Sequence, residues 1–320
     1  YGAAGDADGS RVWALDEDSG SWNPVGGFPI SQVGLLGVTA GELFALSSEY
    51  GPFRLEPGGF VSISGDLPST ALAGRALTPD PGDTSHLYYG TQRDGLWESL
   101  DGGSSWTQMT SLDPGSDVFP LVYYVAVDPA NSEVIYVRLN DSSGSVEQPL
   151  FRPDEEQNSG GGLFVSPDGG ESWIRSGAGL FRLTFDPSET VTDEHGTRSR
   201  VLYSTGGGKT AVMVSTDGGL TFERAQDGLH GVYTNALREF GGRLYTAGEQ
   251  GIDHISSSPD TLGEEWMFRK TGLIYTWDRA PVPGDDDAFL YVTGEPAWGN
   301  DDLTGLWLAE SLACNDLEQD

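Results

Sequence analysis

The chain has 320 residues, with 49 acidic and 17 basic side chains, so its formal net charge is −32 at pH 7. A surface this acidic repels nucleic acid phosphates and anionic lipids, so we expect no nucleic acid partner. No segment approaches the roughly 18 consecutive apolar residues that a membrane-spanning helix needs, and we expect no membrane span. Cys314 is the only cysteine, which excludes an internal disulfide and a cysteine-cluster zinc site.

Glycine and proline are spread along the whole chain, with 46 and 18 residues respectively. Such a distribution is typical of many tight turns between short strands. No charged linker divides the sequence. We therefore predict an all-β fold that forms one domain over residues 1–320.

One pattern returns three times in nearly complete form, within residues 95–106, 162–173 and 212–222. Each copy has a short strand of alternating apolar residues, then Asp-Gly-Gly, then Ser or Thr, and an aromatic residue. The pattern predicts a hairpin, because the aspartate accepts bonds from turn amides and glycine tolerates positive φ. The aromatic residue supplies a large apolar anchor for packing the hairpin on the next sheet. The shared positions are Ser99, Asp101, Gly103 and Trp106, then Ser166, Asp168, Gly170 and Trp173, then Ser215, Asp217, Gly219 and Phe222.

The pattern Ser-x-Asp-x-Gly-x-(Ser/Thr)-(Trp/Phe) resembles the Asp-box, or BNR repeat, of sialidase-like β-propellers. The resemblance implies a single propeller of four-stranded blades, in which each box joins the third and fourth strands at the outer rim. It places the boxes away from the central site. The resemblance therefore implies a fold much more than a function.

In chain order, Tyr1–Asp6 aligns with the second strand of a blade, so the first blade begins without its inner strand. The intervening sequence repeats every roughly 40 to 50 residues, the period of a four-stranded blade. The last blade has little chain after Leu308 for a fourth strand, and no long helix is expected. Third strands are expected around Trp13, Phe53, Trp97, Phe164, Met213, His254 and Trp307. We predict seven blades, with six as the alternative.

The other strands are predicted from the same period. Inner strands are expected at Val122–Val127, Leu180–Phe185 and Tyr233–Arg238. Second strands are expected at Leu87–Tyr89, Val134–Arg138, Val201–Ser204, Arg243–Thr246 and Phe289–Thr293.

Propellers bind ligands with the loops that lead from the second to the third strand and from blade to blade, which have no repeated structural role here. The candidate ligand-binding residues in these loops are Tyr50, Arg93, Asp94, Arg138, Arg152, Glu249, Glu295 and Trp298. The segment Asn140–Gly161 is the longest irregular stretch, and its length suits either a binding loop or an ordinary surface insertion.

We predict an extracytoplasmic, monomeric module that binds a glycan or a protein and is not an enzyme; the alternative is a glycoside hydrolase. A sialidase would need three convergent arginines, for which Arg93, Arg138 and Arg152 are available, and a Tyr-Glu pair, which the spacing does not indicate. Xyloglucanase-type glycosidases also carry these repeats and use two carboxylates, but they pair two propellers and this chain holds one. Catalytic residues are not assigned.

No cofactor is expected, and the signals for a metal are weak. Gly5–Ser10 and Asp285–Asp287 are rich enough in oxygen for Ca²⁺. The histidines, His86, His195, His230 and His254, show no metal-binding spacing and are expected to be structural or exposed.

Overall fold

In the computed structural model, strands and turns alternate along the chain, and the one helical segment among the described residues is a short 3₁₀ turn, η1 (Ser69–Ala71). The structure describes the backbone of residues 2–6, 9–16, 21–27, 35–39, 42–47, 49–112, 121–140, 162–176, 180–193, 196–206, 212–225, 234–240, 243–248, 251–256, 267–271, 276–282, 285–294 and 305–309. Side chains are described at 21, 23–24, 42–47, 49–112, 121–139, 162–176, 183–186, 189–193, 196–204 and 212–225.

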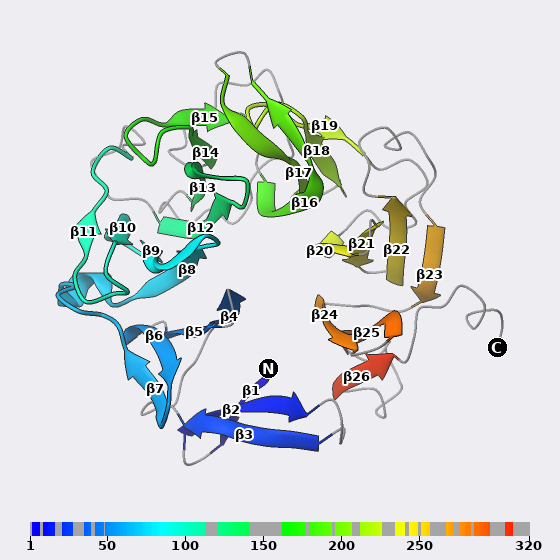
Figure 1. The fold of residues 1–320 in the computed structure, drawn as a ribbon, viewed down its shortest axis with the longest axis horizontal. Coiled ribbons are helices and arrows are strands. Elements are labelled where there is room, and N and C mark those ends of the chain that lie inside the picture. The colour runs from blue at the N-terminus through cyan, green and yellow to red at the C-terminus, as the bar shows by residue number, and fades with distance from the viewer. Residues whose placement is uncertain are drawn as a thin grey trace. The chain divides into compact units, whose positions relative to one another are not determined.

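The chain divides into two units, and the first comprises Tyr1–Val146 and Asp154–Gly177. The described strands of this unit form four antiparallel sheets (Figure 1). Sheet A contains β1 (Gly2–Asp6), β2 (Gly9–Asp16) and β3 (Ser21–Gly27). Sheet B contains β4 (Leu35–Thr39), β5 (Glu42–Ser47), β6 (Gly51–Glu56) and β7 (Gly59–Ser62). Sheet C contains β8 (Gly74–Asp80), β9 (Asp83–Thr91), β10 (Leu96–Ser99) and β11 (Thr107–Gln108). Sheet D contains β12 (Leu121–Asp128), β13 (Asn131–Asn140), β14 (Gly162–Ser166) and β15 (Ile174–Ser176).

The second unit comprises Glu147–Pro153 and Ala178–Asp320, and its described strands form three sheets. Sheet E contains β16 (Leu180–Thr192), β17 (Arg198–Gly206), β18 (Met213–Ser215) and β19 (Glu223–Arg224). Sheet F contains β20 (Thr234–Phe240), β21 (Arg243–Gly248), β22 (Gly251–Ser256) and β23 (Met267–Thr271). Sheet G contains β24 (Thr276–Val282), β25 (Asp285–Gly294) and β26 (Gly305–Ala309).

Strand β9 shows how the sheets of the first unit pack. Alternate side chains of a strand point to opposite faces. Leu87 and Tyr89 join a core with Phe44 of sheet B, whereas Tyr88 joins a core with Val125 of sheet D. All three β9 residues are fully buried. Sheet C is therefore covered on both faces, as stacked blades require.

The three repeated hairpins share one hydrogen-bond arrangement. In the first, Ser99 Oγ donates to Asp101 Oδ1 at 2.9 Å and accepts from the Gly103 amide at 2.8 Å. Asp101 Oδ1 also accepts from the Ser105 amide at 2.8 Å. The second and third copies repeat these bonds with Ser166, Asp168, Gly170 and Ser172, and with Ser215, Asp217, Gly219 and Thr221.

The second glycine of each turn is required by its backbone conformation. Gly103, Gly170 and Gly219 have φ of 87°, 91° and 88°, in the left-handed region that side chains disfavour. A Cβ on Gly103 would also lie 2.5 Å from the Ile63 carbonyl oxygen. A larger residue would therefore both strain the turn and push the neighbouring sheet away.

The expected all-β propeller of four-stranded blades is confirmed as a fold class. The predicted inner, second and third strands coincide with described strands, and sheets A and G each show three strands, as expected for the first and last blades. Trp106 and Trp173, however, contact the preceding sheet or the connection after it rather than the next sheet, since Trp106 donates to Ile63 and Trp173 to Ser111. The blade count and the single domain stay predictions.

Candidate functional site

The candidate residues that the structure describes lie at corresponding places in sheets B, C and D. Tyr50 occupies the turn between β5 and β6, is 50% exposed, and donates its amide to Ser47 Oγ. Arg93 is exposed and Asp94 half-buried in the turn between β9 and β10. Arg138 lies near the end of β13. Each residue is where its sheet passes from the second to the third strand.

Asp94 is the most firmly held of these residues. Its amide donates to Thr91 Oγ1 at 2.8 Å, and its carbonyl accepts from Trp97 Nε1 at 3.0 Å and Gln108 Nε2 at 2.8 Å. Thr70 Oγ1, in η1, donates to Asp94 Oδ2 at 2.8 Å. The turn therefore fixes the main chain of Asp94, and the preceding connection holds its carboxylate through Thr70. Such support is what an orienting or reacting group needs.

Arg138 differs from a free loop side chain. It is 7% exposed, and its guanidinium carbon lies 5.0 Å from the ring centroid of Tyr123 on the neighbouring strand β12. Burial lowers the pKa of Arg138, an effect that Tyr123 opposes. The sequence analysis did not single out Tyr123, which is 40% exposed.

The other candidates, Arg152, Glu249, Glu295 and Trp298, lie outside the described residues, as does most of the insertion Asn140–Gly161. The same holds for the side chains of both proposed Ca²⁺ segments. Of the first segment, Gly5 and Asp6 end β1, and Gly9 and Ser10 begin β2; Asp285–Asp287 begins β25. Within the described ranges, no group of three or more acidic, histidine or cysteine residues is arranged to hold a metal ion.

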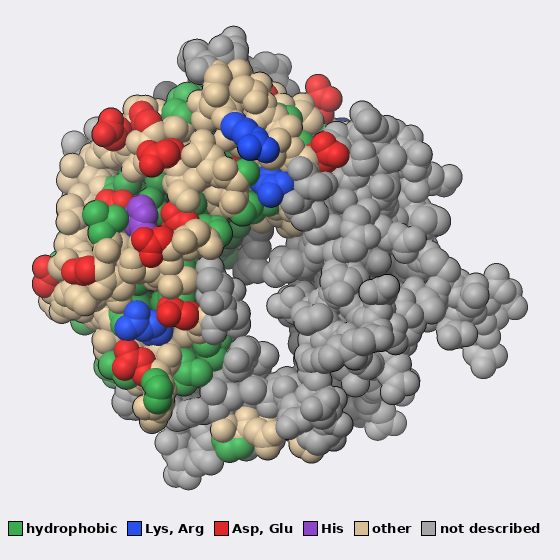
Figure 2. Space-filling model, viewed as in Figure 1, with side chains coloured by type: hydrophobic (Ala, Val, Ile, Leu, Met, Phe, Trp, Pro, Cys, Tyr) green, Lys and Arg blue, Asp and Glu red, His purple; other side chains and the backbone are tan. Residues whose placement is uncertain are grey.

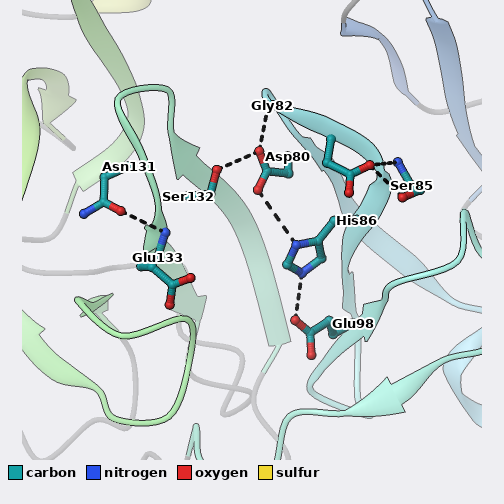
Figure 3. Close-up of polar contacts among 9 residues, drawn as sticks. Asp80, Gly82, Ser85, His86, Glu98, Asn131, Ser132 and Glu133 are labelled. Carbon is teal, nitrogen blue, oxygen red and sulfur yellow. Dashed lines mark hydrogen bonds and ion pairs between the residues drawn. The ribbon is translucent and has the colours of Figure 1, made fainter.

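A second polar cluster lies at the opposite ends of the strands, around His86 (Figure 3). His86 Nε2 lies 2.7 Å from Glu98 Oε1, and Nδ1 lies 3.8 Å from Asp80 Oδ2. The bond to Glu98 raises the pKa of His86 against the opposing effect of burial, and the charges of Glu98, Asp80 and Asp83 act in the same direction as the bond. Ser132 of sheet D donates to Asp80 Oδ1 at 2.9 Å. The cluster thus joins two sheets, and both ring nitrogens face carboxylates.

Asp80 also belongs to a repeated turn that the sequence analysis missed. The dipeptide Asp-Pro recurs at the end of the first strand in sheets C and D, and inside β16 of sheet E where the pairing is irregular. The aspartates, Asp80, Asp128 and Asp186, are 3%, 0% and 0% exposed. Each accepts a nearby amide of its own turn at 2.7 to 2.8 Å. The His86 cluster is therefore built on a structural turn, and we assign it a structural role.

Acidic side chains are spread over the described surface, with few basic ones among them (Figure 2). This agrees with the net charge of −32. In the part of the chain that the structure describes, no helix is long and apolar enough to cross a membrane.

No protein family model matches the chain. Among curated proteins, a xyloglucanase of Hypocrea jecorina is 26% identical over 229 residues, which are 70% of this chain and 21% of that protein. A xyloglucanase of a Paenibacillus species is 32% identical over 124 residues, 35% of this chain and 11% of the relative. The chain therefore spans at most about a fifth of the length of these relatives.

Solved structures of β-propeller enzymes have the same fold. A GH74 xyloglucanase from Xanthomonas campestris superposes with a TM-score of 0.57 at 17% identity, covering 95% of this chain and 49% of that one. A GH74 enzyme from Niastella koreensis gives 0.56 at 18% identity, covering 82% and 40%. At these identities the likeness supports the fold alone.

The expectation of a binding module without enzymatic activity is wrong. The curated relatives are xyloglucanases, which point to a glycoside hydrolase, the alternative that the sequence analysis left open. The error has a physical cause. The repeated residues form turn hydrogen bonds and packing contacts. They therefore indicate a fold that proteins of many functions share, and they do not indicate whether the protein catalyses a reaction.

Proposed function

We propose that this chain is part of an extracytoplasmic glycoside hydrolase that cleaves xyloglucan. The observation that carries the proposal is the alignment with the Hypocrea jecorina xyloglucanase over 70% of the chain. We further propose that the three repeats are Asp-boxes and that residues 1–320 form one seven-bladed propeller. The partner is then a glycan, which contacts the ends of sheets B, C and D that carry Tyr50, Arg93 and Arg138.

Hydrolysis of a glycosidic bond uses two carboxyl groups, one as the acid and one as the base or nucleophile. We propose Asp94 as one of them. It lies in a candidate turn, and its main chain and carboxylate are held by Thr70, Thr91 and Gln108. A carboxylate fixed in this way reaches the glycosidic bond without an ordering cost at the time of reaction.

The test is hydrolysis of xyloglucan by the full-length protein that carries this chain, measured as the release of reducing ends. Asp94→Asn keeps an oxygen that can accept the Thr70 hydroxyl, but it cannot ionise or deliver a proton. We expect the variant to lose about hundredfold or more in rate while it still binds xyloglucan. Asp83→Asn is the matched control, because Asp83 is an exposed carboxylate that is held by Ser85 at the other end of β9.

Hydrolysis that survives Asp94→Asn unchanged would remove Asp94 from the proposed pair and leave the activity standing. A protein that neither cleaves nor binds xyloglucan would contradict the proposed function itself.

A further inference from the structure

An extra residue interrupts strand pairing near the start of the first strand in several sheets. In sheet D, Val122 pairs with Leu139 and Tyr124 with Arg138, which leaves Tyr123 without an opposite residue. The pairings of sheets C, E and F skip one residue at the same place. Such β-bulges re-aim one side chain and are common beside binding sites. The skipped residues are Arg75, Tyr123, Phe181 and Asn235.

The bulge turns Tyr123 out of the packed sheet. Its neighbours Val122 and Val125 are 0% and 2% exposed and belong to the core between sheets C and D, whereas Tyr123 is 40% exposed. The first of these neighbours is tightly packed, since a Cβ added at Gly90 of β9 would lie 2.4 Å from Val122 Cγ1. The residue before Tyr123 is therefore anchored in the core between sheets C and D.

The ring of Tyr123 is held from one side by Arg138. The guanidinium carbon lies 5.0 Å from the ring centroid, within the range of a cation–π contact, and Arg138 is 7% exposed. The buried guanidinium thus lies over the ring, while Tyr123 itself stays 40% exposed. A flat aromatic surface that is already ordered loses little freedom when a ligand packs on it.

We propose that the exposed face of Tyr123 is a stacking platform for a pyranose ring of a neutral glycan, a glucose unit of the xyloglucan chain. The inference rests on the proposed function and adds a binding residue to it. The C–H groups on one face of a glucose ring present an apolar surface, which an aromatic ring covers without needing a charge. A net charge of −32 disfavours anionic glycans.

The experiment measures binding of xyloglucan oligosaccharides to the full-length protein by calorimetry, for the wild type and for Tyr123→Ala, Tyr123→Phe and Tyr123→Trp. We expect Tyr123→Ala to bind about tenfold more weakly, and the two aromatic variants to bind within about threefold of the wild type. Ile174→Ala is the matched control, because Ile174 is also 40% exposed and lies in the same sheet, on β15. It should leave affinity unchanged.

The outcomes separate this inference from the proposed function. Equal affinity of the wild type and Tyr123→Ala for xyloglucan would overturn the platform and leave the glycosidase intact. Oligosaccharides of unbranched glucan, mannan and xylan are tested in parallel. Binding of one of these instead, with loss in Tyr123→Ala, would support the platform and contradict the xyloglucan assignment. Failure of the wild type to bind any neutral glycan would overturn both.

Discussion

The indole nitrogen of Trp106 donates a hydrogen bond to the main-chain oxygen of Ile63 at 2.9 Å. Trp106 lies in the repeated hairpin of sheet C, whereas Ile63 follows the last strand of sheet B. The Trp106 amide adds a second link, to Asp66 Oδ1 at 2.7 Å. The repeat therefore closes its own turn and also ties its sheet to the preceding one.

Replacing Trp106 should lower the free energy of unfolding, and a smaller replacement should lower it more. Trp106→Phe loses the bond to Ile63 and should lower the free energy of unfolding by about 1 kcal/mol. Trp106→Ala also leaves a cavity and should lower it by about 3 to 5 kcal/mol. Urea unfolding measures both. Leu100→Ala, in the turn of the same hairpin and 69% exposed, is the control and should change little. Equal losses for all three variants would contradict the packing role.

The aspartate of the repeat should matter more than its acidic neighbour. Asp168→Ala removes the acceptor of the Ser172 amide and hydroxyl and of the Ser166 hydroxyl. We expect a loss of about 1 to 3 kcal/mol in the free energy of unfolding. Glu171→Ala, an exposed residue of the same turn, should stay within about 0.5 kcal/mol of the wild type. The prediction fails if chemical denaturation cannot distinguish the two variants.

Acid should weaken the repeated turns. Burial acts to raise the pKa of Asp168, but the bonds from Ser172 and Ser166 outweigh it and hold the pKa below the ordinary value of 3.8. A lowered pKa in the folded state gives stability that is present above pH 3.8 and is lost as pH falls through the folded value. Urea unfolding at decreasing pH should therefore show a smaller acid loss in Asp168→Asn than in the wild type. Glu171→Gln is the control, and its free energy of unfolding should depend on pH as that of the wild type does.

His86 should have the opposite pH dependence. The bond to Glu98 raises the pKa of His86 above 6.5. A raised pKa gives stability that is fully present below pH 6.5 and is lost as pH rises through the folded value. The free energy of unfolding, followed from about pH 6 to 9, should decline in the wild type but stay flatter in His86→Gln, which does not titrate. Parallel curves for the two proteins would show that the Glu98 contact contributes nothing.

The strands and repeated turns could be predicted because their causes are local. Asp101 and Ser99 are two residues apart, so the pattern that predicts the hairpin contains both partners of the bond. The Asp-Pro turns are also local, and aligning the first strands by their Asp-Pro dipeptides could have found them. The Asp-Gly-Gly pattern is longer and stronger, and it does not include the Asp-Pro dipeptide.

The site residues were harder to predict because they depend on strand register. Tyr123 is exposed since the pairing of β12 with β13 skips it, and no local pattern distinguishes it from Tyr124. Arg138 was expected in a ligand loop, yet its place opposite Tyr124 buries it beneath the neighbouring ring. His86 and Glu98 meet only because β9 and β10 pair. Such contacts follow from the assembled sheet and not from the sequence of either strand.

The central claim, hydrolysis of xyloglucan, is tested most directly by chromatography of the sugars that the full-length protein releases. Xyloglucan and an unbranched glucan are incubated separately, with Asp94→Asn and Asp83→Asn run beside the wild type. The account predicts shorter oligosaccharides from xyloglucan with the wild type and with Asp83→Asn, and almost none with Asp94→Asn. Intact xyloglucan after incubation with the wild type would contradict the account.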